Sequence, residues 1–268
     1  MLSITPARDR TTGVVTLPSG IRLPYTEQGA PDGAPVVLVH GYSDSRSAWE
    51  PVLDHLPGDV RAVAVTQRGH GDADRPVSGY RPHDLAADTI AAMDVLGIGR
   101  AVVVGHSAGT VTAQRIAAER PERVHALVLV GAAPTFRGNP VLEELWNDVV
   151  QLEDPVDQEF VREFQASTAV HPLPPGLLET VVEESCKLPA RVWRAALRDL
   201  LDVGPAERPI TAPTLVVRGE HDEIARQEDL DAVVAAIPQA RTAVYGDTGH
   251  SPHWEQPKRL AAAIAALA

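Results

Sequence analysis

Six stretches of the chain are apolar at almost every position instead of alternating between apolar and polar residues. A strand with apolar side chains on both faces must be covered on both sides, as in a parallel sheet between two layers of helices. The six stretches are residues 35–40 (PVVLVH), 61–66 (RAVAVT), 101–105 (AVVVG), 124–131 (VHALVLVG), 214–219 (TLVVRG) and 242–246 (TAVYG). Residues 13–29 (GVVTLPSGIRLPYTEQG) predict two more short strands around a Pro-Ser-Gly turn.

Helical patterns separate most of these strands. In residues 83–98 (HDLAADTIAAMDVLGI) the apolar side chains gather on one side of a helix, and Gly97 marks its end. Strands that alternate with helices are typical of an α/β fold, in which a parallel sheet is wrapped on both faces. The length of 268 residues is enough for one such domain, or for one domain that carries an insertion.

The alternation stops between residues 135 and 208, where no segment has the pattern of a strand. Four segments there have helical patterns instead: PVLEELWNDVVQL, PVDQEFVREFQAS, GLLETVVEESC and ARVWRAALRDLLD. Between Arg137 and Arg208, 14 Asp and Glu residues stand against 7 Lys and Arg residues, a net charge of −7. We therefore expect a helical insertion (residues 135–208) with an acidic, solvated outer face.

The whole chain is also acidic, since 24 Lys and Arg residues against 36 Asp and Glu residues give a charge of −12. The basic residues are scattered, which argues against nucleic acid as a partner. The single cysteine, Cys186, cannot form an internal disulfide, and no Cys/His spacing indicates a metal site. The first residues (MLSITPARDRTTG) lack the apolar core of a signal peptide, and the late run LAAAIAALA is about half of a membrane span. We expect a cytoplasmic protein without a membrane partner.

A serine stands where the third apolar stretch must become a helix, in the sequence Gly105-His106-Ser107-Ala108-Gly109. A G-x-S-x-G turn between a buried strand and a helix lifts the serine hydroxyl clear of the carboxyl edge of the sheet. Glycines two residues before and after the serine avoid collisions with the neighbouring strand and helix. The first N–H groups of the helix point to the same place, where they can stabilise a negative charge. The pattern predicts that Ser107 is a nucleophile.

A serine nucleophile needs a base that takes its proton and a carboxylate that orients the base. Asp222 follows the fifth apolar stretch and His250 follows the sixth, so both leave the edge of the sheet that carries Ser107. The chain order serine, acid, histidine is the order expected for this architecture. Two flanking carboxylates are alternatives for the acid, Glu220 and Glu223.

The turn after the first apolar stretch adds two hydrogen-bond donors to this edge. His40-Gly41 ends the strand there, and the N–H of Tyr42 can meet the N–H of Ala108 across the carbonyl oxygen of a substrate. Two such donors form an oxyanion hole, and each is worth on the order of 10² to 10³ in rate. We interpret the neighbouring His106 and His253 as packed residues without a role in proton transfer.

Together these motifs resemble the α/β-hydrolase fold superfamily along nearly the whole chain. They are His40-Gly41, QRGHG at 67–71, GHSAG at 105–109, GEHD at 219–222 and GH at 249–250. The resemblance implies a doubly wound, mostly parallel sheet of eight strands with a helical cap inserted after the sixth strand. It divides the chain into a core, residues 1–134 and 209–268, and a cap, residues 135–208. It also implies Ser107, Asp222 and His250 as nucleophile, acid and base. The chain departs from the family pattern at Thr66, where many members have an aspartate that serves a loop hydrogen bond.

The predicted activity is that of a serine hydrolase that cleaves a small carboxylic ester or lactone through an acyl-enzyme. This chemistry requires neither a metal nor an organic cofactor. A serine nucleophile argues against haloalkane dehalogenase or epoxide hydrolase chemistry, because those relatives use aspartate. Trp146 and Trp193, both in the insertion, are the candidates for lining the substrate pocket. The sequence predicts no oligomeric state.

Three alternatives stay open. The carbon–carbon bond hydrolases of aromatic degradation share the three residues and often carry a cap arginine, for which Arg191 or Arg194 could stand. Many of them, however, have an aromatic residue directly after the histidine, where this chain has Ser251. Cofactor-free perhydrolases share the same residues. Other relatives bind a small ligand as receptors with little turnover, and repeated turnover of an ester distinguishes an enzyme from such a receptor.

Overall fold

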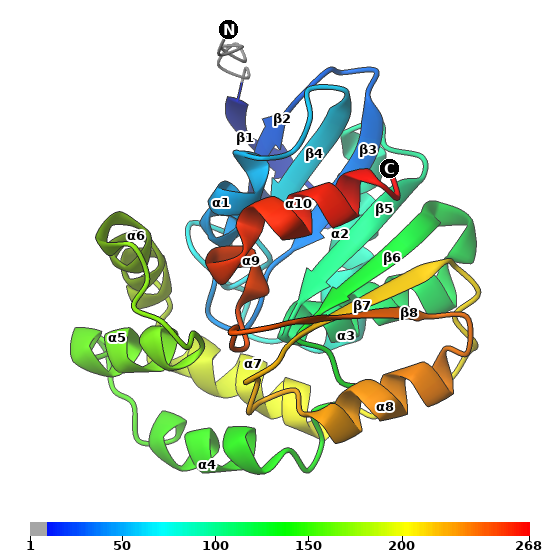
Figure 1. Cartoon of the computed structure of the whole chain (residues 1–268). Helices are drawn as coiled ribbons and strands as arrows, with labels where there is room; N and C mark the ends of the chain where they lie inside the picture. Colours follow the sequence, from blue (N-terminus) through cyan, green and yellow to red (C-terminus); the bar gives the residue numbers. More distant parts are fainter. Residues whose placement is uncertain (1–9) are drawn as a thin grey trace, which may run out of the picture.

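A computed structural model describes residues 10–268, in which eight strands form one sheet (Figure 1). The strands are β1 (Arg10–Thr16), β2 (Arg22–Gln28), β3 (Ala34–Val39), β4 (Val60–Val65), β5 (Ala101–His106), β6 (Val124–Val130), β7 (Thr214–Gly219) and β8 (Arg241–Tyr245). Their order across the sheet is β1-β2-β4-β3-β5-β6-β7-β8. The β1–β2 and β2–β4 pairs are antiparallel, and all other pairs are parallel. The predicted fold class, a mostly parallel eight-stranded sheet of the α/β type, is confirmed.

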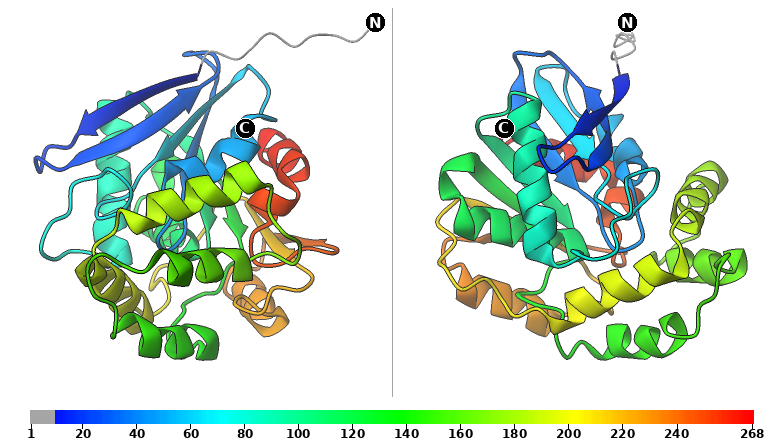
Figure 2. Two further views of the ribbon diagram at one scale, coloured as in Figure 1. Left: turned by 90° about the vertical axis from the view of Figure 1, so that its left-hand side faces the viewer. Right: turned by 180° about the vertical axis from the view of Figure 1, so that it is seen from behind.

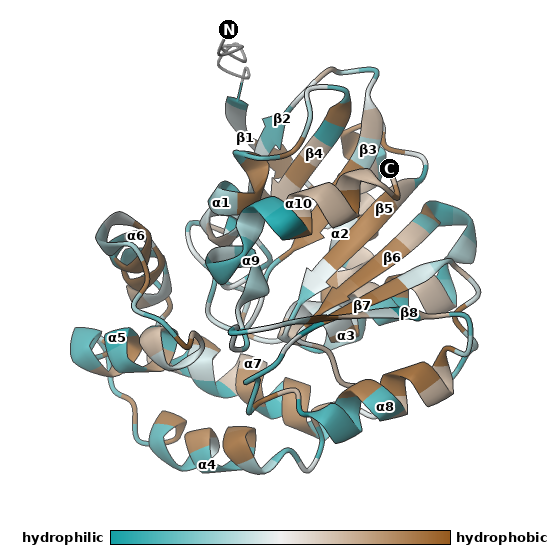
Figure 3. Ribbon diagram, in the orientation of Figure 1, coloured by the Kyte–Doolittle hydropathy of each residue, from teal (hydrophilic) through white to brown (hydrophobic). Residues whose placement is uncertain are grey.

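Alternate residues of the central strands enter two different apolar cores. In β3, Val37 and Val39 belong to the core beneath α2 (Pro82–Val95), α3 (Ala108–Glu119) and α8 (Gln227–Ala236). Val36 and Leu38 belong to the core beneath α1 (Glu50–Leu53) and α10 (Pro257–Ala265). Figures 2 and 3 show these helices on both faces of the sheet and the apolar residues along the strands. Burial on both faces explains why the strand stretches are continuously apolar.

The chain between β6 and β7 forms four helices and, within residues 131–213, no strand, as the sequence predicts. The helices are α4 (Pro140–Val149), α5 (Gln158–Ser167), α6 (Pro175–Cys186) and α7 (Ala190–Asp202). They lie beyond the carboxyl ends of the central strands (Figures 1 and 2). They share an apolar core with Tyr42 in the loop after β3, Val111 on α3 and Ala133 in the loop after β6. β6 and β7 are neighbours in the sheet, so the insertion leaves the strand pairing intact. The division of the chain at 134/135 and 208/209 stays a prediction.

Smaller features complete the fold. α2 ends at Val95, and Gly97 follows with φ +70°, where the pattern predicts the helix end. The short helices are η1 (Arg46–Trp49), η2 (Pro121–Arg123) and α9 (Pro252–Glu255).

Within residues 10–268, no helix has the length and apolar character needed to cross a membrane. The expectation about a signal peptide concerns the start of the chain, of which residues 1–9 lie outside the described part.

Candidate active site

The turn from β5 to α3 carries Ser107 in a strained backbone conformation. Ser107 has φ 50° and ψ −122°, a combination that residues other than glycine rarely adopt. Gly105 and Gly109 make the turn possible because the backbone is crowded around them. A Cβ atom on Gly109 would lie 2.5 Å from the carbonyl oxygens of Val39 and His40, and one on Gly105 would overlap the carbonyl of Gly109. The collisions expected from the sequence are therefore real, and they fix the place of Ser107 at the end of β5.

A buried carboxylate holds the ring of His250. Both carboxylate oxygens of Asp222 lie 2.9 Å from His250 Nδ1. Because an ionised carboxylate only accepts hydrogen bonds, Nδ1 carries the proton of the neutral ring and Nε2 keeps its lone pair. The Nε2 atom is buried and has no hydrogen-bond partner among residues 10–268. It is therefore available to accept a proton from a group in the cavity that His250 and Ser107 both line.

Backbone donors help to keep Asp222 ionised. The N–H groups of Ile224 and Ala225 donate to its Oδ1 over 2.9 and 2.8 Å. Burial of Asp222 would raise its pKa, but the His250 ring and the two N–H groups outweigh burial and lower the pKa below the ordinary value. A carboxylate that stays charged inside the protein can stabilise a positive charge on the adjacent imidazole.

The structure distinguishes Asp222 from the two flanking acids. Glu220 is exposed, and its Oε2 accepts a hydrogen bond from the N–H of Asp247 over 3.1 Å. Glu223 is also exposed. Of the three carboxylates, only Asp222 is hydrogen bonded to His250.

The loop after β3 presents the N–H of Tyr42, and α3 begins with the N–H of Ala108. Neither N–H has a hydrogen-bond acceptor in the part of the chain that the structure describes. His40 shapes this loop: its Nδ1 lies 2.8 Å from the carbonyl of Gly41, and its Nε2 accepts from the N–H of Gln67 over 2.9 Å. Burial, with smaller contributions from nearby histidines, lowers the pKa of His40 well below its ordinary value, so the ring is neutral. Two unused donors thus lie at the edge that carries Ser107.

Thr66 stands where many members of the superfamily have an aspartate that serves a loop hydrogen bond. Thr66 Oγ1 accepts a hydrogen bond from the N–H of Arg46 over 3.2 Å. The hydroxyl therefore serves a loop hydrogen bond at this position.

A cavity lies between the carboxyl edge of the sheet and the helical insertion. It is lined by Tyr42, Asp44, His106, Ser107, Leu142, Phe164, Gln165, Thr168, Leu200, Ile224, His250, Ser251 and Trp254. Apolar side chains of α4, α5 and α7 form one wall, and polar side chains around Asp44 form another. No Lys or Arg is among these lining residues. Ser107 therefore faces a cavity with an apolar wall, a polar wall and no cationic side chain.

Neither Trp146 nor Trp193 lines this cavity, contrary to the expectation from the sequence. The amphipathic helix α7 directs Trp193 into the apolar core, where its ring lies 5.2 Å from the ring of Tyr42 and is fully buried. Its carbonyl accepts a hydrogen bond from the Tyr42 hydroxyl over 2.8 Å. Trp146 lines a separate hollow of the insertion, where the Arg198 guanidinium lies 5.6 Å from its ring centre. Trp193 thus packs against Tyr42 in the apolar core, and Trp146 lines the separate hollow.

Sequence reasoning missed two polar residues of the cavity wall, Asp44 and Gln165. Asp44 stands two residues after Tyr42, and this proximity to a donor of the oxyanion hole was a usable signal. Gln165 lies on α5, and its side-chain amide donates to Asp44 Oδ1, to Ser43 Oγ and to Ser185 Oγ, over 3.1, 3.2 and 2.8 Å. Ser43 itself has a positive φ of 62°. The insertion therefore holds the loop that carries Tyr42.

His106 and His253 form a buried cluster behind Ser107. His106 Nε2 lies 3.0 Å from the carbonyl of His250, which only accepts, so Nε2 carries the proton. Burial lowers the pKa of His106 to about 3 and the pKa of His253 well below its ordinary value. With Asp44 they are the one group of three ligand atoms close enough to hold a metal ion among residues 10–268. The centroids of the two rings lie 4.0 Å apart, and the ring planes are inclined by 41°.

The family of the chain follows from a comparison with known proteins. A model described as "Alpha/beta hydrolase family" matches residues 36–263. The chain belongs to the alpha/beta hydrolase family. The resemblance predicted from the motifs is confirmed, and the protein is an alpha/beta hydrolase that acts on small molecules.

Proteins similar to this alpha/beta hydrolase have names that refer to different substrates. The chain is 27% identical to 2-(acetamidomethylene)succinate hydrolase of Mesorhizobium japonicum, over 91% of this chain and 90% of the relative. Its structure is similar to that of a putative aryl esterase from Burkholderia cenocepacia, with a TM-score of 0.85 and 21% identity over 96% of this chain and 97% of the other. It is also similar to the enol-lactonase from Burkholderia xenovorans LB400, with a TM-score of 0.83 and 20% identity over 95% and 99% of the two chains.

Proposed function

We propose that this alpha/beta hydrolase is a serine hydrolase that cleaves a small carboxylic ester or lactone through an acyl-enzyme. One observation carries the proposal. The strained Ser107 lines the same cavity as His250, whose ring is fixed on the buried Asp222 and whose Nε2 is free. A nucleophile, a base and a carboxylate that orients the base are the parts that acyl transfer requires.

In the proposed mechanism Ser107 Oγ attacks the carbonyl carbon of the substrate while His250 Nε2 takes its proton. The carbonyl oxygen becomes negative and is stabilised by the N–H groups of Tyr42 and Ala108. When the tetrahedral intermediate collapses, the bond to the alcohol oxygen breaks and His250 returns the proton to that oxygen. Water, deprotonated by His250, then attacks the acyl-enzyme and releases the acid and Ser107. Asp222 stabilises the imidazolium in both steps.

The lining of the cavity supports an ester or lactone over the alternative of a carbon–carbon bond hydrolase. Arg191 donates to the carbonyls of Arg75 and Pro76, and Arg194 donates to the carbonyl of Leu152, so neither is a cavity arginine. A substrate carboxylate would therefore meet no Lys or Arg in the cavity and would lie near Asp44. The succinate named for the relative from Mesorhizobium japonicum carries two carboxylates, and this cavity offers them no counter-charge.

The test is hydrolysis of p-nitrophenyl esters of increasing acyl length, followed to many turnovers. Wild-type protein should turn over short esters repeatedly, and Ser107→Ala should lower kcat/KM by about 10⁴-fold or more. Asp222→Asn should lower it by about 10⁴-fold because the imidazole loses its orienting carboxylate. The matched control is Glu220→Gln, which removes an exposed carboxylate nearby and should leave kcat/KM at the wild-type level.

Two outcomes would overturn the proposal. Ester turnover that survives Ser107→Ala would assign the activity to another group. Folded wild-type protein that turns over no ester, yet is protected from thermal unfolding by a small ligand, would support a receptor instead.

A further inference from the structure

Asp44 is a buried carboxyl group in the cavity wall without a cationic partner. Its side chain is 4% exposed, and its Oδ1 accepts the hydrogen bond from Gln165. Within residues 10–268, no Lys or Arg forms an ion pair with Asp44. The titratable side chain within ion-pair distance is that of His106, whose Nδ1 lies 3.9 Å from Asp44 Oδ2. Buried carboxylates are normally paired or fully hydrogen bonded, because an unpaired charge is costly away from water. The donors to Asp44 are neutral, namely the Gln165 amide and the backbone N–H of Gly41, so the carboxyl lacks a charged partner.

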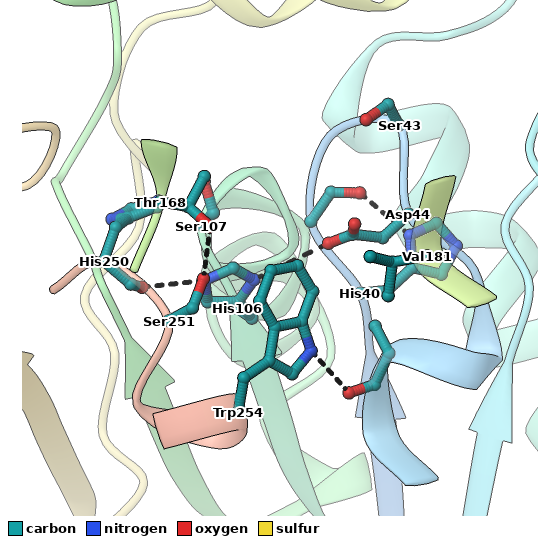
Figure 4. A network of polar contacts seen from close by, with 12 residues as sticks. His40, Ser43, Asp44, His106, Ser107, Thr168, Val181, His250, Ser251 and Trp254 are labelled. Carbon is teal, nitrogen blue, oxygen red and sulfur yellow. Dashed lines mark hydrogen bonds and ion pairs between the residues drawn. The ribbon is translucent and has the colours of Figure 1, made fainter. Parts of the chain in front are cut away.

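The histidines around Asp44 do not supply that donor. Figure 4 shows His106 between the carbonyl of His250 and the carboxyl of Asp44. Since His106 Nε2 donates to the carbonyl, its Nδ1 has only a lone pair to offer Asp44. His106 of β5 and His253 of α9 are both neutral at pH 7 because burial lowers their pKa values. His250, after β8, is the remaining titratable group near Asp44, and its Nδ1 proton points to Asp222.

The hydroxyl and amide groups of Ser251, Thr168 and Gln165 in this wall are hydrogen bonded to one another or to neighbouring groups. The Ser251 hydroxyl donates to Thr168 Oγ1 over 2.9 Å, and the Thr168 hydroxyl donates to the carbonyl of Gln165 over 2.8 Å. The amide of Gln165 donates to three oxygens. The lone pair of His106 Nδ1 also lacks a partner, but that atom is buried and its ring is neutral. Asp44 is thus the charged acceptor in this wall with capacity for a group that arrives from the cavity.

We propose that Asp44 determines specificity by accepting a hydrogen bond from a substrate hydroxyl or ammonium group in the acyl part of the ester, and by repelling carboxylates. Asp44 is two residues from Tyr42, whose N–H we place on the carbonyl oxygen, so the donor group belongs close to the scissile carbonyl. The apolar wall of Leu142, Phe164 and Leu200 then receives the rest of the molecule. This inference rests on the proposed ester hydrolysis.

The experiment compares four methyl esters with four-carbon acyl groups. Methyl butyrate has no donor, methyl 3-hydroxybutyrate has a neutral donor, methyl 3-aminobutyrate has a cationic donor, and monomethyl succinate has a carboxylate. Hydrolysis is followed by acid release at constant pH. At pH 8 the wild-type kcat/KM for the hydroxy and amino esters should exceed that for methyl butyrate by about tenfold or more, and monomethyl succinate should be at least about tenfold poorer.

Asp44→Asn keeps the size of the side chain and removes its charge. It should bring the amino ester to within about threefold of methyl butyrate and improve monomethyl succinate by about tenfold. Burial raises the pKa of Asp44 to about 7, so the wild-type preference for the amino ester should also be weaker at pH 6 than at pH 8. The matched control is Asp32→Asn, an exposed position at the opposite end of β3 that should keep the wild-type preferences.

The outcomes separate this inference from the proposed function. Hydrolysis of methyl butyrate with the same relative rates in wild type and Asp44→Asn would overturn the role of Asp44 and leave the serine hydrolase standing. A wild-type preference for monomethyl succinate would overturn it as well. Absence of hydrolysis for all four methyl esters and for all p-nitrophenyl esters would overturn both proposals.

Discussion

Two buried carboxyl groups of the site, Asp222 and Asp44, have pKa values shifted in opposite directions. Asp222 receives donors from His250, Ile224 and Ala225, so its pKa is lowered. Asp44 receives the Gln165 amide and the backbone N–H of Gly41, which are both neutral, and burial raises its pKa to about 7. Burial opposes ionisation of both acids, and it is outweighed only at Asp222, where the His250 ring acts together with the hydrogen-bond donors. Residues of one type acquire two different roles in this way.

The raised pKa of Asp44 makes stability depend on pH. A carboxyl whose pKa is higher in the folded than in the unfolded chain stabilises the fold below about pH 4, and this contribution is lost as the pH rises through about 7. Asp44→Asn lacks this titration, so its stability relative to wild type should increase between pH 5 and pH 8 by up to about 3 kcal/mol. Urea unfolding at the two pH values measures the change, with Asp32→Asn as the control. An equal difference at both pH values would show that Asp44 ionises normally in the folded protein.

At the scale of elements, the start of α3 is the most crowded point of the fold. Gly109 is packed against the backbone of β3, so Gly109→Ala has no side chain to displace and must move the helix or the strand. We expect a loss of about 3 kcal/mol or more in the free energy of unfolding. Gly176→Ala in the first turn of α6 meets open space and should stabilise the protein by about 0.5–1 kcal/mol. Chemical denaturation of both variants tests the contrast, and a Gly109→Ala protein as stable as wild type would contradict it.

The elements that the sequence predicts well are those whose pattern is fixed by burial on known faces. The central strands are apolar on both faces because helices cover both, and the glycines around Ser107 follow from local crowding. The polar wall of the cavity was not predictable in this way. Gln165 looks like a solvent-facing residue of an amphipathic helix, and it is buried only because Ser43, Asp44 and Ser185 meet it from distant parts of the chain. Helical periodicity likewise places Trp146 and Trp193 on faces of their helices but does not say what those faces contact.

At the scale of the whole molecule, the charge of −12 adds a long-range effect to the local one of Asp44. The acidic surface should raise the local concentration of a cationic ester and lower that of an anionic ester at low ionic strength. Between about 0.01 and 0.5 M salt, kcat/KM for methyl 3-aminobutyrate should fall by about two- to fivefold, while the value for methyl butyrate stays constant. Because buried charges are screened less, the effect of Asp44→Asn should persist at high salt. An equal salt response of the two esters would contradict this account.

The position of the helical insertion between two neighbouring parallel strands has a consequence for how such a protein can change over time. Since β6 and β7 pair directly, the four helices can be rebuilt or exchanged without altering the register of the sheet. The exchange is nevertheless not free, because Gln165 and the Ser185 hydroxyl, which donates to the carbonyl of Ser43, hold the loop that presents the N–H of Tyr42. A substitution in the pocket wall can therefore change the rate of the reaction as well as the choice of substrate. Lineages that acquire new substrates should therefore retain, or replace in kind, the two side chains that brace this loop.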